Sequence, residues 1–425
     1  MIRIQKRIQY IDLIRGILMI ILFLDFPWDR LFSLPASILS YNSTESKKII
    51  LFIAIVAFLI TLVKYGKLGS KFKFLIHFTI ATCISVTFVM LCSVFMYNEQ
   101  TIIRTFSLAH HYYLVILALV FVAVFSYKNG EEKISKALNL YSFAWYILVF
   151  TQSMLYAYKG IVFFGGIDLS WTGFLSTNLL RISLISIPNF MIVYNFSVIL
   201  EKKGKSLNYI QFALGMFCLL AIQQTRAYDV VIIASCIIMY TFKSRNPVRV
   251  LRNVLIACVV LIAILNTNYA QELLRSFIND SSNVKMSSNL ARLYAYPYYW
   301  SCFLNNPLVG SGFAAPERYS YITNGPLGIA SYSDTGIVGI IAQLGIFGLM
   351  IYGTYIIRMI YIVVMMQKKN ALQYNTFCLG ILCYCVATSV SLINMSVAVI
   401  LLFPICIAYM EFRYYQLRMA RAIEK

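Results

Sequence analysis

The chain has 425 residues, of which 60% are hydrophobic and 12% are charged, and its mean hydropathy is +0.76. Soluble domains carry about 25% charged residues, so this composition excludes an ordinary soluble protein and indicates a helical membrane protein. A net charge of +20 would favour nucleic acid as the partner of a soluble chain, but cytoplasmic loops of membrane proteins also collect Lys and Arg. No nucleic-acid partner is therefore expected.

Runs of about twenty apolar residues predict membrane-spanning helices, because a helix of that length crosses a hydrocarbon core of about 30 Å. The predicted fold is an all-α polytopic membrane protein with about twelve transmembrane helices. The seventh and eighth spans are separated by only four residues, which predicts a tight helical hairpin. The predicted spans are 10–28, 47–64, 74–96, 106–127, 137–157, 181–200, 206–225, 227–242, 253–270, 335–358, 371–390 and 392–411.

The distribution of Lys and Arg predicts the orientation, because positively charged loops stay in the cytoplasm. Both termini and every second connection carry most of these residues, so both termini are expected to be cytoplasmic. The hairpin turn at 223–226 and the loop 158–180 are then expected on the outer face. We expect a single membrane domain over residues 1–425, with an extracytoplasmic (periplasmic) loop at 271–334 that holds short helices between the ninth and tenth spans.

Cysteine and histidine give no sign of a metal site. Nine of the ten cysteines lie in apolar runs, and no CxxC or Cys/His metal spacing is present. The three histidines are His77, His110 and His111, in or near the third and fourth spans, so the long loop holds no histidine-based centre. Neither a metal nor another cofactor is expected.

Arg226 lies at the outer end of the predicted hairpin, three residues before Asp229. A charge at the end of a membrane span is costly unless it is paired or hydrated. One alternative is that Arg226 reaches the membrane interface or pairs with Asp229. The other is that it binds an anionic substrate.

Arg292 lies in the segment 287–300, which predicts a short amphipathic helix with Ser287 or Ser288 as its N-cap. Pro297 is expected to kink this helix or to begin a second one. The many Tyr and Trp residues suit a membrane interface, so a helix resting on the outer leaflet is one interpretation. That interpretation does not account for Arg292.

The segment 305–313 is rich in Asn, Gly and Pro, which predicts a turn with close backbone approach. Glu317 and Arg318 follow it and are expected to be solvated loop charges. Asp334 directly precedes an apolar span, where an Asp is also a good N-cap. Capping and chemistry therefore remain alternatives for Asp334.

Five segments, taken in this order, resemble the O-antigen polymerase (Wzy) and O-antigen ligase superfamily over roughly residues 205–360. They are Thr225-Arg226-Ala227; Arg292 with its aromatic helix; Asn306-Pro307-Leu308-Val309-Gly310-Ser311-Gly312; Ser333-Asp334-Thr335-Gly336-Ile337-Val338-Gly339; and Leu344-Gly345-Ile346-Phe347-Gly348.

The resemblance implies a GT-C-like integral-membrane glycosyltransferase in the bacterial inner membrane that uses undecaprenyl-diphosphate-linked oligosaccharides. It also implies a flippase and a chain-length regulator as partners, beside membrane lipid. The ligase branch has a His-Asn or His-Ser pair before the corresponding Gly-rich span, where this chain has Ser333-Asp334. This departure favours the polymerase branch.

The reaction that the resemblance implies assigns roles to the polar residues of the outer face. Arginine binds phosphate oxygens with a planar, permanently charged fork, so Arg226 and Arg292 are expected to clamp the diphosphate. Asp334 is the first candidate for the proton acceptor and Glu317 the second. The residues expected to bind sugar, phosphate or lipid are Arg181, Asp168, Tyr296, Tyr299 and Trp300.

Two other classes stay open beside a polymerase. One is a different membrane transferase, either a ligase or an acyltransferase. The segment Tyr10-Ile11-Asp12-Leu13-Ile14-Arg15-Gly16 resembles the first span of membrane acyltransferases, although no His follows it closely. The other class is a flippase for lipid-linked oligosaccharides, but transporters usually place charges in mid-span, and the candidate charges here lie at span ends and in a loop.

Overall fold

The computed structural model describes residues 2–32, 44–66, 71–165, 178–184, 186–244, 246–265, 271, 283–391 and 393–423. Within these residues the secondary structure is helical, without strands. The first half comprises α1 (Ile2–Leu24), α2 (Trp28–Leu31), α4 (Thr44–Tyr65), α6 (Lys73–Met96), α7 (Ile102–Ala109), the 3₁₀ segment η1 (His110–Ile116), α8 (Leu117–Phe125), α9 (Gly130–Lys159) and α10 (Ser186–Leu200).

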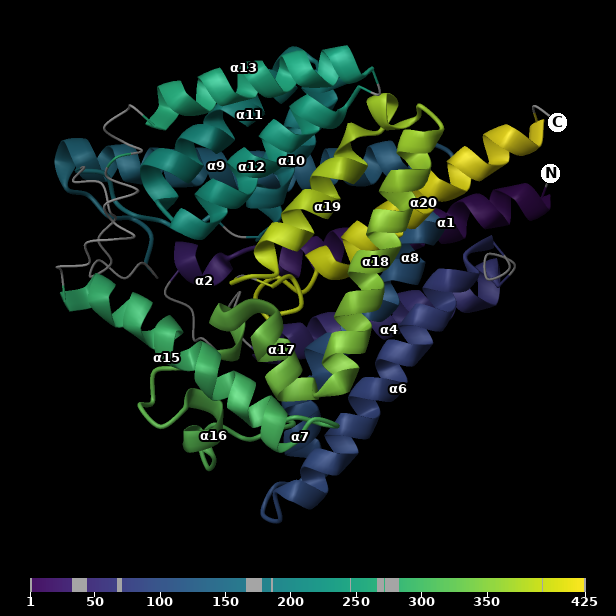
Figure 1. The fold of residues 1–425 in the computed structure, drawn as a ribbon. Helices are drawn as coiled ribbons and strands as arrows, with labels where there is room; N and C mark the ends of the chain where they lie inside the picture. Colours follow the sequence, from purple (N-terminus) through teal and green to yellow (C-terminus); the bar gives the residue numbers. More distant parts are fainter. Residues whose placement is uncertain are drawn as a thin grey trace.

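The second half carries the long polar segment among its helices. It comprises α11 (Ser206–Phe217), the π-helical segment η2 (Cys218–Gln223), α12 (Arg226–Phe242), α13 (Pro247–Leu265), α15 (Asn283–Asn305), α16 (Ser320–Asn324), the 3₁₀ segment η3 (Tyr332–Thr335), α17 (Gly336–Leu344), α18 (Ile346–Lys368), the 3₁₀ segment η4 (Leu372–Tyr374), α19 (Thr376–Thr388) and α20 (Leu402–Ile423). Both termini lie at one end of the molecule, and α15, α16 and the start of α7 lie at the other (Figure 1).

The predicted fold class, an all-helical polytopic membrane protein, is confirmed. Five helices in the described part of the chain are long and apolar enough to cross a membrane: Ser46–Tyr65, Lys73–Met96, Ile102–Phe125, Ser206–Gln223 and Ile346–Lys368. Ser186–Leu200 and Thr376–Thr388 are shorter apolar helices. The total of about twelve spans stays a prediction.

The span built from α7, η1 and α8 is the centre of the packing. About 83% of its apolar window is buried inside the protein, against 33–39% for the other four spans. The helices α4, α6 and α20 pack around it. An apolar helix that is buried on all sides serves as a core for its neighbours, so the remaining spans are left to face lipid.

The predicted span 335–358 is not one continuous helix. The helix is interrupted at Gly345, which has φ +61°. This break separates the short α17 from the membrane-length α18. Hydropathy runs smoothly through the break, and only the backbone conformation reveals it. The predicted span 392–411 likewise includes turns, and its helix begins at Leu402.

The predicted helix around Arg292 is present and is longer than predicted. It continues through Pro297 without a break in the assigned helix. The expectation that Ser287 or Ser288 caps it is wrong, because α15 begins at Asn283 and both serines lie inside it.

The turn after α15 docks directly onto the α17–α18 break. The Ser311 amide donates to the Ala342 carbonyl at 2.7 Å, and the Ile346 amide donates to the Pro307 carbonyl at 2.9 Å. A Cβ atom at Gly310 would overlap the Ala342 carbonyl, and one at Gly345 would overlap the Leu308 carbonyl. Two glycines with positive φ therefore allow two backbone segments to lie in direct contact.

The end of α6 holds the same turn from its other side. The Ser93 hydroxyl accepts from the Phe313 amide at 2.9 Å, and the Tyr97 hydroxyl donates to the Ser311 carbonyl at 2.5 Å. The Gln100 side chain bonds both the Phe313 carbonyl, at 2.6 Å, and the Ala315 amide, at 2.9 Å. The turn is thus fixed by buried hydrogen bonds rather than left as an exposed loop.

We predict that Gly310→Ala lowers the thermal stability of the purified protein, by an amount equivalent to about 1–3 kcal/mol, because Ala at φ +62° is strained and overlaps Ala342. Thermal unfolding in detergent measures the change. Gly353→Ala in α18 is the matched control, since its added Cβ meets nothing within 4 Å. Equal melting temperatures for the two variants would contradict the docked arrangement.

Candidate active site

The segments α15 and η3 lie side by side, and the charge of Arg292 acts on Asp334. Arg292 is half-buried, and Asp334 keeps part of its side chain exposed to solvent while the rest lies against the protein. Loss of water to the surrounding protein raises the pKa of Asp334 above its ordinary value, while the positive charge of Arg292 and a hydrogen bond with Ser333 act to lower it. A carboxylate with a raised pKa beside a cation is suited to proton transfer.

The end of α19 holds both partners in place. The Ile337 amide, three residues after Asp334, donates to the Ser389 carbonyl at 2.8 Å. The Tyr296 hydroxyl, one helical turn after Arg292, donates to the Val390 carbonyl. Since both α15 and the start of α17 are anchored to these neighbouring carbonyls, the Arg292–Asp334 arrangement rests on a shared support.

Asp334 does not serve as the N-cap of α17. The N-cap position is Thr335, and no side chain donates or accepts a capping hydrogen bond there. The capping alternative therefore does not explain Asp334.

The aromatic residues of α15 divide into buried and exposed members. Tyr299 is fully buried, donates its hydroxyl to the Thr323 carbonyl at 2.6 Å, and stacks on Tyr332 with ring centroids 4.5 Å apart. Trp300 is exposed, and Tyr296 is half-buried. Tyr299 thus supports the site from within, while Tyr296 and Trp300 keep surface for contact with a ligand.

A second group forms where α11 turns into α12. Arg181, ahead of α10, donates from Nε to the Gln223 carbonyl at 3.0 Å. Burial lowers the pKa of Arg181, the positive charge of Arg226 lowers it further, and the buried Asp229 opposes both. The group holds two arginines and one carboxylate, so it carries excess positive charge that an anion would offset.

The sequence analysis missed Gln223 in this second group. It is the last residue of the π-helical segment η2, and its side chain is 1% exposed. Neither amide atom of Gln223 has a hydrogen-bond partner among the described residues. Such burial costs about 1–3 kcal/mol, and π-helical turns are frequent at functional sites. The only sequence signal is a Gln-Gln pair at a span end, within the turn of the predicted hairpin.

The two arginine groups lie on the same face of the membrane if α11–η2 and α18 cross it. Both segments are long and apolar enough to do so. Their opposite ends, at Lys202 and Gln373, line one common pocket. Gln223, at the other end of α11–η2, and Gly345, at the other end of α18, then lie together on the opposite face of the membrane. The lengths of the two helical segments separate them from that pocket by about 27–35 Å.

The remaining predicted residues are elsewhere. Glu317 forms an exposed ion pair with Arg104 of α7, and Arg318 pairs with Glu99 at 3.1 Å. These contacts agree with the interpretation of both as surface charges. Asp168 lies outside the described residues.

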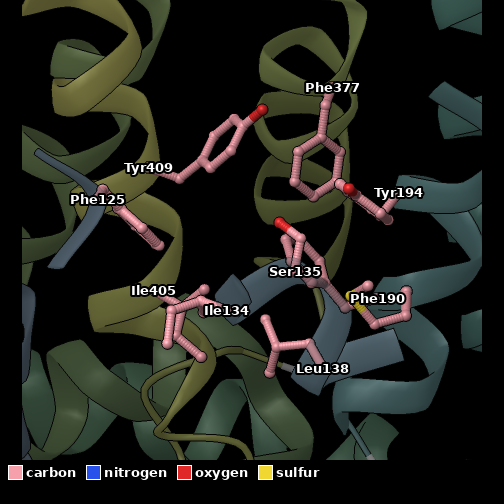
Figure 2. Close-up of a pocket in the computed structure, with 10 residues that line it drawn as sticks. Phe125, Ile134, Ser135, Leu138, Phe190, Tyr194, Phe377, Ile405 and Tyr409 are labelled. Atoms are coloured by element: carbon pink, nitrogen blue, oxygen red, sulfur yellow. The ribbon is translucent and has the colours of Figure 1, made fainter. Parts of the chain in front are cut away.

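One enclosed cavity is too small to be a substrate site. It lies between α8, α9, α10, α19 and α20, with Ser135, Tyr194 and Tyr409 among its lining residues (Figure 2). Its volume of about 20 Å³ holds roughly one water molecule. A sugar or a diphosphate does not fit.

Comparison with known families gives one match. Residues 211–353 match a protein family described as O-antigen ligase. The segment contains Arg226, Arg292, Asp334 and the two docked Gly-rich motifs, so the resemblance to the O-antigen ligase and polymerase superfamily is confirmed there. No curated protein matches the chain. The match supports a multi-pass membrane enzyme of the O-antigen ligase or polymerase type.

We predict that Gln223→Leu leaves the protein as stable or makes it more stable, by on the order of 1 kcal/mol, yet lowers its catalytic activity. The leucine removes a buried amide that has no hydrogen-bond partner among the described residues, and with it a group that we propose bonds the substrate. Thermal unfolding and a transfer assay measure the two effects.

Gln152→Leu is the matched control for this substitution. Both polar atoms of the buried Gln152 amide are hydrogen-bonded, to Ile161, Phe163 and Phe164 at 2.9–3.0 Å, so its loss should destabilise the protein. A Gln223→Leu variant that is destabilised like Gln152→Leu would show that Gln223 is structural.

Proposed function

We propose that the chain is a polysaccharide polymerase that joins undecaprenyl-diphosphate-linked oligosaccharide repeat units at the outer face of the bacterial inner membrane. The observation that carries the proposal is the approach of Arg292 to Asp334 within the segment that matches the O-antigen ligase family. A cation beside a carboxylate of raised pKa supplies the two elements that glycosyl transfer from a lipid diphosphate requires.

In the proposed reaction, a hydroxyl oxygen of the acceptor repeat unit attacks the anomeric carbon of the growing glycan. The bond between that carbon and the diphosphate oxygen breaks, and undecaprenyl diphosphate leaves with the electron pair. The hydroxyl proton passes to the Asp334 carboxylate. A base is most effective when its pKa lies close to the working pH, and the raised pKa of Asp334 moves it in that direction.

The arginines stabilise the leaving group. Negative charge accumulates on the diphosphate as the bond breaks, so cations fixed in position lower the barrier. Arg292 faces the carboxylate, while Arg226 and Arg181 supply the second cationic group on the same proposed face. These cations provide the charge stabilisation without requiring a metal ion. In this proposal the Gln223 amide bonds a sugar hydroxyl or a phosphate oxygen of the bound substrate, and Tyr296 and Trp300 contact a sugar or the lipid.

An O-antigen ligase is the second candidate, favoured by the description of the matched family. A ligase would move a finished glycan from the lipid carrier to a different acceptor without lengthening it. Ser333-Asp334 stands where the ligase branch has a histidine pair, and this favours the polymerase. The length of the lipid-linked glycan separates the two candidates.

We predict that Arg292→Ala reduces polymerisation at least about a hundredfold, because losing one contact to the leaving group costs about 3 kcal/mol. Single lipid-linked repeat units should accumulate, as measured by the length distribution of the glycan at matched membrane levels of protein. Arg318→Ala, which removes an exposed arginine paired with Glu99, should keep the wild-type ladder. A wild-type ladder in Arg292→Ala would remove Arg292 from the active site.

The pH dependence tests the proton acceptor. Asp334 must be ionised to accept a proton, so the rate should fall as the pH falls through its raised pKa. The Ser333 hydrogen bond lowers this pKa, so Ser333→Ala should raise it and move the acid limb of the pH–rate profile to higher pH. The rate above that limb should change little. Ser320→Ala in α16 is the control, and an acid limb that stays in place in Ser333→Ala would contradict the assignment.

A further inference from the structure

A basic pocket lies at the opposite end of α18 from the candidate active site. Its volume is about 420 Å³, more than tenfold the roughly 30 Å³ that one water occupies in the liquid. Three connections that are distant in sequence meet there: the one between α10 and α11, the one between α12 and α13, and the one between α18 and α19. The connections supply Lys202, Lys243 and Gln373, and the start of α13 supplies Arg249 and Arg252.

The pocket concentrates positive charge without a matching carboxylate in its lining. Among the described residues, none of its four cations takes part in an ion pair. Lys243 donates to the Leu200 carbonyl at 2.9 Å, which fixes its ammonium group at the pocket. The nearby Glu201 is committed elsewhere, because it bonds the Thr376 amide at 2.7 Å and Lys203 at 2.7 Å.

The start of α13 adds to this charge instead of offsetting it. Helix N-termini carry partial positive charge and favour acidic side chains, yet the first turn of α13 has none. This turn contains Arg249 instead, Arg252 follows it, and both side chains are exposed. Two arginines at a helix N-terminus are electrostatically unfavourable unless an anion lies between them and the helix end.

An apolar stripe runs along α13 away from the pocket. Val248, Leu251, Leu255 and Val259 follow helical spacing and are 73%, 61%, 59% and 66% exposed. The N-terminus of α13 and the connection between α18 and α19 lie at the same end of the molecule (Figure 1). A ligand with an anionic head and hydrocarbon chains would therefore fill the pocket and cover the stripe at once.

We infer that this pocket binds the phosphate headgroup of an anionic phospholipid, with its acyl chains lying along α13. The inference does not depend on the proposed polymerase activity. The abundance of Lys and Arg around the pocket predicts that it faces the cytoplasmic leaflet, where basic pockets between membrane helices bind anionic headgroups. Binding joins three connections, so the free energy of unfolding rises as the lipid concentration rises above its dissociation constant.

The test uses the full chain, purified and delipidated in neutral detergent. Phosphatidylglycerol is added, thermal unfolding is followed, and bound lipid is counted by native mass spectrometry. We expect a rise in melting temperature and retained lipid for the wild type, and at least a tenfold weaker apparent affinity for the double variant Arg249→Gln, Arg252→Gln. The matched control is Lys128→Gln, Lys133→Gln, which removes the same charge from exposed positions and should behave as the wild type.

Three outcomes would overturn the inference. The first is an equal response of the Arg249→Gln, Arg252→Gln variant, which would remove the pocket from the binding site. The second is an equal response of the wild type to phosphatidylcholine, which would show contact with hydrocarbon alone. The third is an equal response to inorganic phosphate without lipid, which would assign the pocket to a soluble anion. Both substituted arginines are exposed, and gel filtration before addition of lipid verifies that the variant is folded.

Discussion

The direct contact between the 306–313 turn and the break at Gly345 is the constraint on which the candidate site depends. Backbone amides and carbonyls of the two segments pair with each other, and a Cβ atom at Gly310 or at Gly345 would prevent this approach. The contact ends α17 and begins α18, and it holds the end of α15 beside α17. Arg292 and Asp334 are thereby held close enough for their charges to interact.

The electrostatics of the two arginine groups follow from partial burial. At a membrane surface, a cation that is partly removed from water keeps its charge, and its electrostatic attraction to an anion becomes stronger. Arg292 has a nearby carboxylate, and Arg181 lies within the electrostatic influence of both Arg226 and the buried Asp229. Each group thus contains a carboxylate near its arginines. The group of Arg181, Arg226 and Asp229 keeps an excess of positive charge, which suits the diphosphate proposed to bind there.

Several features could be predicted from the sequence because they depend on local pattern. Composition gave the membrane class, the spacing of apolar residues gave the helix around Arg292, and the density of Gly and Pro gave a turn at 305–313 with close backbone approach. The break at Gly345 could not be predicted, because it depends on a contact with Leu308 that hydropathy does not register.

The rest of the site required knowledge of contacts between distant residues. The support of Tyr296 by Val390 joins positions 94 residues apart. The pairing of Glu317, the second candidate base, with Arg104 joins the loop to α7. Gln223 is notable only because its buried amide has no partner in the described structure, which no one-dimensional pattern encodes.

The most direct test of the central claim is a structure of the protein in lipid nanodiscs with undecaprenyl diphosphate bound. The account predicts that the diphosphate lies against Arg292 and Arg226, with Asp334 facing the position of the anomeric carbon. A diphosphate bound away from both arginines, or at the basic pocket on the opposite face, would contradict it.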